Sequence, residues 1–459
     1  MKRRSFLKLT AAGTTVVAGS SMLMASAGKP AVKKKPNILL IITDQQHIDT
    51  ISALGCKYIS TPAMDELANT GTSFLESYCP DPVCSPSRAA IFTGRMPSET
   101  GVYNNGASIR KSMPNMGEWF RDQAGYQTIY GGKWHLPGYT TPDVNGFEVL
   151  ACGWSGPGSA LDSSVSLACE SWLRNKSDNQ PFLMVASYIQ PHDICEWLRL
   201  NVTSKGSRFE EIKNELPPLP ENFNFNFEES EMYQNARKSR EPALGNWSED
   251  HWRYYRWSYF RNVEMVDAEI GRLLKTLKET GLRNDTIVVL TSDHGEGMGH
   301  HQTVRKSTTY DESAKVPLII SWPGKLKQKQ VNKNDLVSGY DIMPTLCDLA
   351  EIQKPDKQVG LSLRPVLENS ANLDREFVAM EANSNKAQMI RTKQFKYVAF
   401  NNGDEYFFDM KNDPGETINL KENVEYTNQL NLHRQTFKKW ILGLDIDKRV
   451  PKENRWFVS

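Results

Sequence analysis

Cys84 is the residue of this sequence best placed to act as a nucleophile. It opens the segment Cys84–Arg88, in which Pro86 suits the first position of a helix that continues to Gly94. Cys84 is therefore expected just before a helix N-terminus, where free backbone N–H groups favour an anion. Arg88 adds a permanent positive charge one turn later. A lone cysteine is more often a buried small hydrophobe, but the spacing to Pro86 and Arg88 favours a nucleophile that meets an oxyanion.

Two carboxylates follow strand-like segments that lie far apart in the chain. The apolar run 37–43 ends at Asp44, and the similar run 286–292 ends at Asp293. Such runs are typical of strands buried on both faces of a parallel sheet, and ligands bind beyond the carboxyl ends of these strands. Either Asp alone would more often be a helix cap or a turn residue. Together they predict a shared site, where a divalent cation relieves their mutual repulsion.

Two further apolar runs end in basic residues. Residues 128–130 lead to Lys133 and His135, and residues 182–188 lead to His192. A single Lys or His in a loop is usually a solvated surface group. Four strand ends that deliver carboxylates and cations to one sheet edge indicate instead a shared site for an oxyanion.

These motifs resemble the signature of the type I, formylglycine-dependent sulfatases of the alkaline phosphatase superfamily. Residues 84–88 match the Cys-x-Pro-x-Arg element, and residues 93–95 match the Thr-Gly-Arg that follows it. Gly-Lys-Trp-His at 132–135 and Asp-His-Gly-Glu at 293–296 also match family patterns. The resemblance runs from about residue 37 to residue 420.

The resemblance implies a modification and a set of roles. It implies that a maturation enzyme oxidises Cys84 to formylglycine (3-oxoalanine), whose hydrate attacks sulfur. The implied metal ligands are Asp44, Gln45, Cys84, Asp293 and His294. The implied sulfate contacts are Lys133, His192 and Lys306, and the implied catalytic residues are Cys84, Arg88, Lys133, His135, His192, Asp293 and Lys306. His301 occupies a recurrent family position, and its role stays open between substrate binding and structural support.

The sequence departs from the family at one metal position. The family commonly has two adjacent aspartates where this chain has Asp44 and Gln45. An amide oxygen can still coordinate calcium, although the site then carries one less negative charge. Calcium (Ca²⁺) is our first choice of ion and magnesium (Mg²⁺) the second.

The predicted reaction is hydrolysis of a sulfate ester. Asp293 and the metal activate a hydroxyl of hydrated formylglycine, and Arg88 and His135 hold this nucleophile. His192 or Lys306 protonates the departing alcohol. A sulfated carbohydrate is the favoured substrate class, because such substrates are common in the family and because the chain carries an export signal. The alternatives are a phosphonate monoester or phosphodiester hydrolase of the same superfamily and a non-catalytic binder of sulfated glycans.

Length and charge set the outer bounds of the prediction. At 459 residues the chain exceeds what one hydrophobic core usually organises. The net charge of +1 argues against a nucleic-acid binder with a basic surface. We expect an α/β catalytic domain at 28–355, whose large, mostly parallel central sheet is flanked by helices as in the alkaline-phosphatase-like sulfatase fold. A smaller antiparallel sheet plus helix is expected at 356–459.

Residues 1–27 have the pattern of a twin-arginine signal peptide. Arg3 and Arg4 precede a weakly apolar stretch that ends in a small-residue cleavage site at 25–27. An N-terminal anchor helix is the weaker alternative, because Gly, Ser and Thr dilute the stretch. Export by the Tat machinery implies a periplasmic or secreted protein, and no later stretch is expected to span a membrane. The cysteines other than Cys84 are expected to be buried free thiols, with room for one disulfide.

The remaining segments give coarser expectations. Residues 195–248 carry no sustained helical or strand period, which predicts a long irregular insertion that forms a wall of the substrate pocket. Residues 252–281 predict an amphipathic helix with an aromatic start in the core and a buried face of Met265, Ile270, Leu273, Leu274 and Leu277. Short strands are expected at 377–380, 388–391, 397–400 and 406–409, and a closing helix at 425–444.

Overall fold

The computed structural model describes residues 34–136, 144–153, 156–201, 210–244, 247–369 and 371–456. The chain from Lys35 onward forms one compact unit. The predicted signal peptide lies outside the described residues. Within them, no helix is both long enough and apolar enough to cross a membrane.

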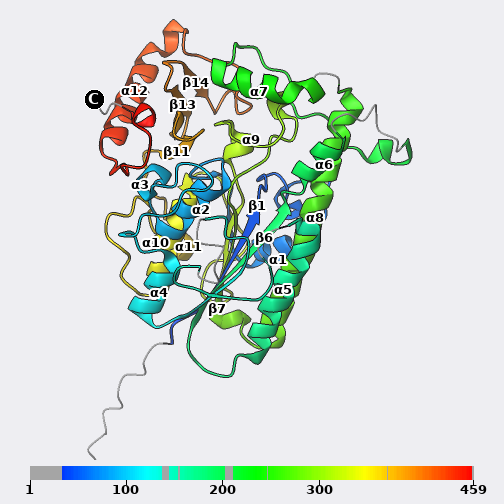
Figure 1. Ribbon diagram of the computed structural model, residues 1–459, viewed down its shortest axis with the longest axis vertical. Coiled ribbons are helices and arrows are strands. Elements are labelled where there is room, and N and C mark those ends of the chain that lie inside the picture. The colour runs from blue at the N-terminus through cyan, green and yellow to red at the C-terminus, as the bar shows by residue number, and fades with distance from the viewer. Residues whose placement is uncertain are drawn as a thin grey trace, which may run out of the picture. The chain divides into compact units, whose positions relative to one another are not determined.

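An eight-stranded sheet forms the centre of the compact unit (Figure 1). Its strands, in spatial order, are β5 (Glu148–Val149), β4 (Gln127–Gly132), β6 (Phe182–Pro191), β1 (Asn37–Asp44), β7 (Thr286–Ser292), β8 (Leu318–Ser321), β2 (Thr72–Phe74) and β9 (Gln330–Asn332). All neighbouring pairs are parallel except β8, which runs antiparallel to both β7 and β2. The predicted α/β class with a mostly parallel sheet is confirmed.

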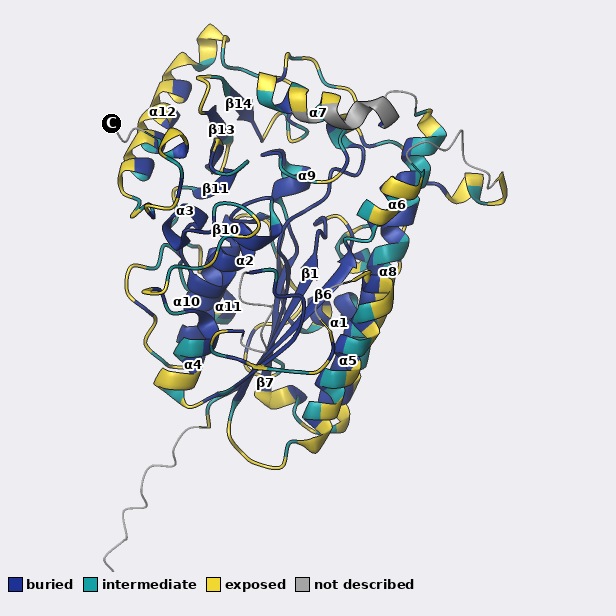
Figure 2. Cartoon of the chain, in the orientation of Figure 1, coloured by how far each residue is buried: buried dark blue, intermediate teal, exposed yellow. Residues whose placement is uncertain are grey.

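The central strands are buried on both faces because their sequences are apolar at consecutive positions. In β1, Leu39 and Ile41 enter one hydrophobic core, whereas Ile38, Leu40 and Ile42 enter a second core on the opposite face. Alternation of side chains along a strand produces this division. Figure 2 shows the buried sheet between two layers of helices.

One helix layer carries α1 (Pro62–Thr70), α5 (Gly158–Asn175) and α8 (Glu249–Glu279), and the other carries α2 (Cys84–Thr93), α4 (Met116–Ala124), α10 (Ile342–Leu349) and α11 (Arg364–Asn369). Two short helices, α3 (Pro97–Thr100) and α9 (Asp311–Ala314), connect larger elements. 3-10 turns occur at Ser52–Leu54, Glu210–Glu215, Arg283–Asp285, His300–Gln302, Gly339–Asp341, Val424–Tyr426 and Lys452–Asn454. Leu363, Val366 and Leu367 pack into the core of the large sheet, so the chain around α11 remains part of the α/β layers.

The long helix α8 confirms the predicted amphipathic helix with one exception. Ile270, Leu273, Leu274 and Leu277 are buried, and the aromatic start packs in the core through Trp252, Tyr255, Tyr259 and Phe260. Met265 is 42% exposed, so the prediction that it is buried was wrong. The buried stripe instead passes through Val263 and Val266, which lie on the sheet side of the helix.

The prediction of an irregular insertion at 195–248 was also wrong. This segment contributes to α6 (Ile194–Asn201) and forms α7 (Glu231–Leu244). Ile194 and Leu198 anchor the eight-residue α6, and among the residues of α7 whose burial is described, Tyr233 and Leu244 are buried. Tertiary contacts therefore stabilise helices that the hydrophobic periodicity of this segment does not predict.

A four-stranded antiparallel sheet follows near the C-terminus, as predicted. It contains β11 (Val378–Ala382), β12 (Ala387–Arg391), β13 (Phe395–Phe400) and β14 (Glu405–Asp409). One face packs on α12 (Thr427–Leu442) through Leu430, Phe437 and Ile441, and the other packs on residues 310–316 and on Tyr233 of α7. A small parallel pair joins β3 (Ser77–Tyr78), which follows β2 in the sequence, to β10 (Val337–Ser338), which follows β9.

All seven cysteines are free. Five are buried, whereas Cys56 and Cys195 are half-buried. The expectation of buried free thiols is confirmed for most of them, and none of the seven forms a disulfide.

Candidate active site

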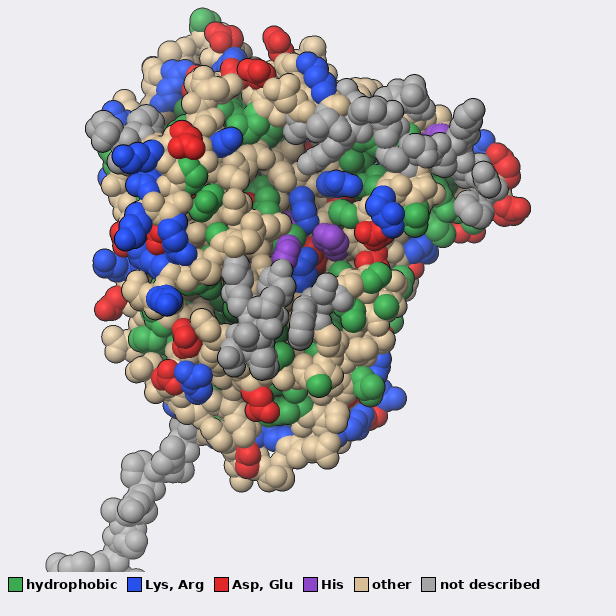
Figure 3. Space-filling view, viewed as in Figure 1, with side chains coloured by type: hydrophobic (Ala, Val, Ile, Leu, Met, Phe, Trp, Pro, Cys, Tyr) green, Lys and Arg blue, Asp and Glu red, His purple; other side chains and the backbone are tan. Residues whose placement is uncertain are grey.

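The carboxyl ends of four neighbouring strands meet at one edge of the large sheet. In the pairing register, Thr43 lies opposite Ser292, Asp44 opposite Pro191, and Gly132 opposite Ser187. This alignment brings the residues that follow β4, β6, β1 and β7 together, as predicted. In Figure 3, histidine side chains meet lysine or arginine side chains near the middle of the face above β1 and β6.

Cys84 lies at the centre of this edge as the first residue of α2. The helix begins at Cys84 itself, so Pro86 occupies its third position and not its first. The side chain is only 1% exposed. Lys306 Nζ and His294 Nε2 each lie 3.2 Å from Cys84 Sγ. Lys133 Nζ lies 3.8 Å and Asp44 Oδ1 3.9 Å from the same atom.

These neighbours favour negative charge at residue 84. Burial acts to raise the pKa of the Cys84 thiol, but the nearby Lys133, Lys306 and His294 hold it well below its usual value. Burial acts to lower the pKa of Lys306, yet Cys84 and Asp44 raise it, so this ammonium group stays charged. The Sγ atom stands here in the place of the oxygen atoms that an oxidised residue 84 would carry.

Arg88 lies on the same helix and ties the strand ends together. Its Nε donates to Asp293 Oδ2 at 2.8 Å, and its Nη2 donates to Asp44 Oδ2 at 3.4 Å. Its Nη1 donates to the carbonyl oxygen of Lys133 and to Ser187 Oγ. The guanidinium group is fully buried and contacts the carboxylates, so it orients the candidate metal ligands.

Asp44, Cys84, Asp293 and His294 form a group whose ligand atoms all lie within 4.8 Å of one another. Burial and the nearby Asp44 raise the pKa of Asp293, because two carboxylates placed side by side repel each other. His294 Nδ1 donates to the carbonyl oxygen of Gly295 at 3.0 Å, so Nε2 is the nitrogen that faces the group. Burial acts to lower the pKa of His294, but Asp293 and Cys84 raise it, and a bound cation would take the place of the Nε2 proton. This donor set fits a divalent cation.

Gln45 adds an oriented amide to this group. Its Nε2 donates to Glu296 Oε2, and its Oε1 accepts a hydrogen bond of 2.8 Å from Lys306 Nζ. The Glu296 carboxylate also accepts from Tyr255 OH and from the backbone N–H of Arg305. Sequence reasoning quoted Glu296 within a motif but gave it no role; the structure shows that it fixes the Gln45 amide.

The remaining predicted residues occupy different positions. Lys133 Nζ pairs with Asp44 Oδ2 and borders Cys84. His192 is half-buried at the end of β6, where burial, with Lys306 and Lys133 nearby, lowers its pKa to about 4. His135 accepts a hydrogen bond from Ser85 Oγ through its backbone carbonyl, and its buried Nδ1 has no partner among the described residues.

His301 is turned away from Cys84 toward the C-terminal sheet. Its Nδ1 lies 2.7 Å from Glu312 Oε1, and its Nε2 lies 3.1 Å from the carbonyl oxygen of Glu416. Its ring stacks on Tyr310 with centroids 4.0 Å apart, and the side chain is fully buried. Of the two roles left open for His301, these contacts favour structural support.

The segment that carries Lys306 has a strained backbone. Non-glycine residues rarely adopt positive φ, at a cost of about 1–2 kcal/mol each. Five residues of this short segment do so: Met298 (49°), His301 (47°), Gln302 (53°), Arg305 (67°) and Ser307 (81°). Such a conformation persists only where the surroundings hold it in place.

Two elements outside the large sheet hold this segment. The carbonyl oxygen of Glu416 lies 3.1 Å from His301 Nε2, and the fully buried Lys396 of β13 donates to Glu416 Oε1 at 2.7 Å. Lys396 also donates to the carbonyl oxygen of Thr309, just beyond the segment, at 3.0 Å. From α7, Arg237 Nη1 donates to the carbonyl oxygens of His301 and Gln302 at 2.6 and 2.9 Å.

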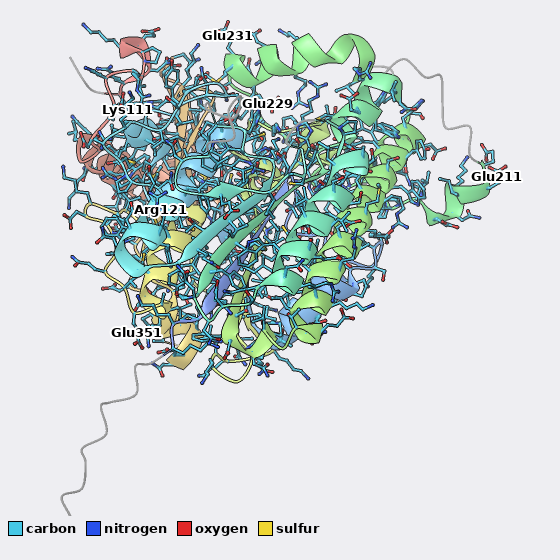
Figure 4. The ribbon with its side chains drawn as sticks, turned by 60° about the horizontal axis from the view of Figure 1, so that its bottom comes forward. Lys111, Arg121, Glu211, Glu229, Glu231 and Glu351 are labelled. Atoms are coloured by element: carbon cyan, nitrogen blue, oxygen red, sulfur yellow. The ribbon has the colours of Figure 1, made fainter. Side chains whose placement is uncertain are left out.

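Arg237 is itself fixed by Glu229, whose carboxylate accepts from its Nε and Nη2. Figure 4 labels Glu229 on the inner side of the start of α7 and Glu231 on its outer side. The segment 195–248 thus stabilises the backbone next to Lys306 through hydrogen bonds from Arg237. The sequence had predicted only that this segment forms a wall of the substrate pocket.

The fold and the site together define a class: an α/β protein whose sheet edge places a candidate metal centre beside a cysteine and two lysines. Residues 36–352 match the family profile described as sulfatase, and residues 299–440 match the one described as N-sulphoglucosamine sulphohydrolase, C-terminal. The chain therefore belongs to the sulfatase family and is a sulfuric ester hydrolase.

Individual relatives are similar over most of the chain. A Delta 4,5-hexuronate-2-O-sulfatase of Bacteroides thetaiotaomicron is 31% identical, covering 92% of each chain. An ulvan-active sulfatase of Formosa agariphila is also 31% identical, covering 85% of this chain and 78% of its own. The solved structure of a 2-O GAG sulfatase, 30% identical, matches with a TM-score of 0.82 over 91% of this chain and 94% of its own.

The hydrogen bonds from Arg237 of α7 to the segment that carries Lys306 predict that loss of Arg237 lowers catalytic efficiency. Arg237→Ala removes two hydrogen bonds from strained backbone and should lower kcat/KM by about five- to tenfold. Lys238→Ala, on the exposed side of the same helix, should leave kcat/KM within about twofold of the parent value. Steady-state kinetics on an aryl sulfate measures both variants. Equal kinetics for the two would contradict this role of Arg237.

The buried His301 predicts a pH dependence of stability. Burial acts to lower the pKa of His301, but Glu312 raises it to about 9, above the value of roughly 6.5 in the unfolded chain. Its contribution is therefore fully present below pH 6.5 and is lost as pH rises through 9. His301→Gln should flatten this decline by on the order of 2 kcal/mol.

Urea unfolding at pH 6 and at pH 9.5 measures the decline. His251→Gln, near the start of α8, serves as the matched control and should keep the parent slope. A parent-like slope in the His301→Gln protein would show that the charged ring does not stabilise the fold.

Proposed function

We propose that this sulfatase hydrolyses a sulfate ester on a carbohydrate, with residue 84, oxidised to formylglycine, as the nucleophile. The single observation that carries the proposal is the position of Cys84, buried between two lysines and the group of candidate metal ligands. Relatives described as acting on hexuronate 2-O-sulfate and on ulvan support a sulfated carbohydrate substrate.

Formylglycine and a divalent cation would supply the activated hydroxyl nucleophile that an unmodified cysteine lacks. A formylglycine hydrate offers a hydroxyl nucleophile, and a divalent cation lowers the pKa of that hydroxyl. We assign Asp44, Gln45, Asp293 and His294 to hold the cation beside residue 84. The oxygen-rich donor set favours Ca²⁺ over Mg²⁺, because Ca²⁺ accepts an irregular set of carboxylate and amide oxygens.

The protein's own cations bind the sulfate group. Lys133, Lys306 and His192 surround the place that the sulfate occupies next to residue 84, and they stabilise charge as it develops on the oxygens. Arg88 keeps the carboxylates in place, and Asp293 accepts a proton from the nucleophile. The buried, unpartnered Nδ1 of His135 is available to bind residue 84 or its hydroxyls.

The departing alcohol needs a proton donor, and His192 and Lys306 are the two candidates. His192 is neutral in the ligand-free protein, because its pKa is about 4, and a bound anion would raise that pKa. Lys306 is charged throughout the neutral range. Lys306 can also act through its charge, and His192 can do so once a bound anion has raised its pKa enough for it to take up a proton.

We also propose that the enzyme acts outside the cytoplasm. The twin-arginine pattern at 1–27 supports export by the Tat machinery to the periplasm or the medium. A formylglycine-generating enzyme is then the partner that the chain requires for maturation.

Turnover of matched substrates tests the proposed function. After expression with a maturation enzyme, mass spectrometry should find an aldehyde at residue 84, and an aryl sulfate should be hydrolysed faster than an aryl phosphodiester or phosphonate. Cys84→Ala should lower kcat on the sulfate by about a thousandfold or more. A strong preference for the phosphodiester would instead identify a phosphodiester hydrolase. An unmodified Cys84 with no turnover would identify a sulfated-glycan binder.

A further inference from the structure

A second cavity, separate from Cys84, lies between the α/β layers and the C-terminal helix α12. Its volume is about 740 Å³, within the range of about 300–1,000 Å³ typical of ligand pockets. Residues of α3, of the stretch 340–379 and of α12 line it. None of the residues assigned above to the metal, the sulfate or the nucleophile is among them.

Two arginine side chains that line this cavity are held in a fixed orientation, because each forms two hydrogen bonds to a carboxylate. Arg95 donates through Nε and Nη2 to Glu99 at 3.0 and 2.6 Å, and Arg375 donates through Nη1 and Nη2 to Asp341 at 2.6 Å each. Arg95 is 5% exposed, and the Arg375 side chain is 7% exposed. Arg95 Nη1 and Arg375 Nε have no hydrogen-bond partner among the described residues, which leaves two fixed donors at the cavity wall.

The unpaired charges at the rim are mostly positive. Lys357 and Lys439 are exposed and have no ion-pair partner within the described part of the chain. The carboxylates of Glu99 and Asp445 are already paired with Arg95 and Arg110. Glu376 opposes the two lysines, and so does Asp445, whose carboxyl pKa is lowered by Arg110 and also by the nearby Lys357. Figure 3 shows lysine and arginine side chains gathered at the left of the view, over α3 and α12.

Aromatic side chains complete the cavity. Trp440 on α12 and Phe377 are half-buried and line it, and the Arg375 guanidinium lies over the Tyr340 ring at 5.6 Å from its centroid. The apolar face of a sugar ring stacks on an indole or phenyl ring, and sulfate or carboxylate groups bind arginine forks and lysines. An aromatic wall beside two unpaired lysines and two carboxylate-paired arginines therefore matches a polymer that alternates C–H faces with anionic groups.

We infer that this cavity is a second, non-catalytic site that binds a sulfated saccharide segment of the polymer whose ester the catalytic site hydrolyses. The inference rests on the proposed carbohydrate substrate. It gives the C-terminal helix a role in holding the polymer, whereas the catalytic site processes one sulfate group at a time.

The test uses paired charge reversals. Lys357→Glu/Lys439→Glu removes the rim cations, and Lys386→Glu/Lys393→Glu makes the same charge change on exposed loops of the C-terminal sheet. Trp440→Ala removes the aromatic wall. With each mature enzyme, kinetics are measured on a sulfated polysaccharide, such as ulvan or heparin, and on a small aryl sulfate.

Loss of the rim lysines or of Trp440 should raise KM for the polysaccharide about tenfold. It should leave kcat on the polysaccharide and both constants on the aryl sulfate unchanged. The Lys386/Lys393 control should shift KM by less than about twofold. The inference is overturned if the rim variant and the control have the same KM, or if the rim variant loses aryl sulfate activity equally.

A binding measurement separates this inference from the proposed function. Tetrasaccharides prepared from heparin and from ulvan are titrated calorimetrically into the Cys84→Ala protein. Two sites per chain are expected, and one should remain after the rim lysines are reversed. Saccharide binding that depends on the rim lysines, without any turnover by the mature enzyme, would refute the proposed carbohydrate substrate but support the second site. A stoichiometry unaffected by the rim lysines would refute the second site.

Discussion

The contacts of one buried guanidinium group organise the catalytic edge. Arg88 reaches Asp44 at the end of β1, Asp293 after β7, the carbonyl oxygen of Lys133 after β4 and Ser187 in β6. A buried ion pair that loses one partner destabilises a protein by about 3–5 kcal/mol, because an unpaired charge remains inside. The two carboxylates lie side by side because cations balance them: Arg88 pairs with both, and Lys133 pairs with Asp44. The geometry around residue 84 therefore depends on Arg88.

The C-terminal sheet and the insertion extend this organisation to Lys306. The strained segment from Met298 to Ser307 is not stable by its own conformational preferences. Glu416 and Arg237 contact it at His301 and Gln302, and Lys396 fixes Glu416, so elements outside the large sheet support the segment that carries Lys306. The smaller sheet thus supports the segment next to the candidate active site through Lys396 of β13.

The sequence predicted the parts of the site that strand ends and short motifs determine. Apolar runs located β1 and β7, and their last residues located Asp44 and Asp293. The motif at 293–296 contained Glu296, but only the structure shows its carboxylate fixing Gln45. Sequence patterns did not reveal α6 and α7, because a few long-range contacts stabilise these helices. Met265 was misplaced because the buried stripe of a long helix is set by the sheet beneath it.

The convergence of four strand ends on one metal and one oxidised side chain is the central claim. Anomalous diffraction from crystals of the mature enzyme grown with Mn²⁺, a hard cation that takes the same oxygen ligands, tests it most directly. The expected result is one strong peak bonded by Asp44 and Asp293 and adjacent to residue 84. A fully occupied Mn²⁺ site elsewhere, with no peak at these carboxylates, would contradict it.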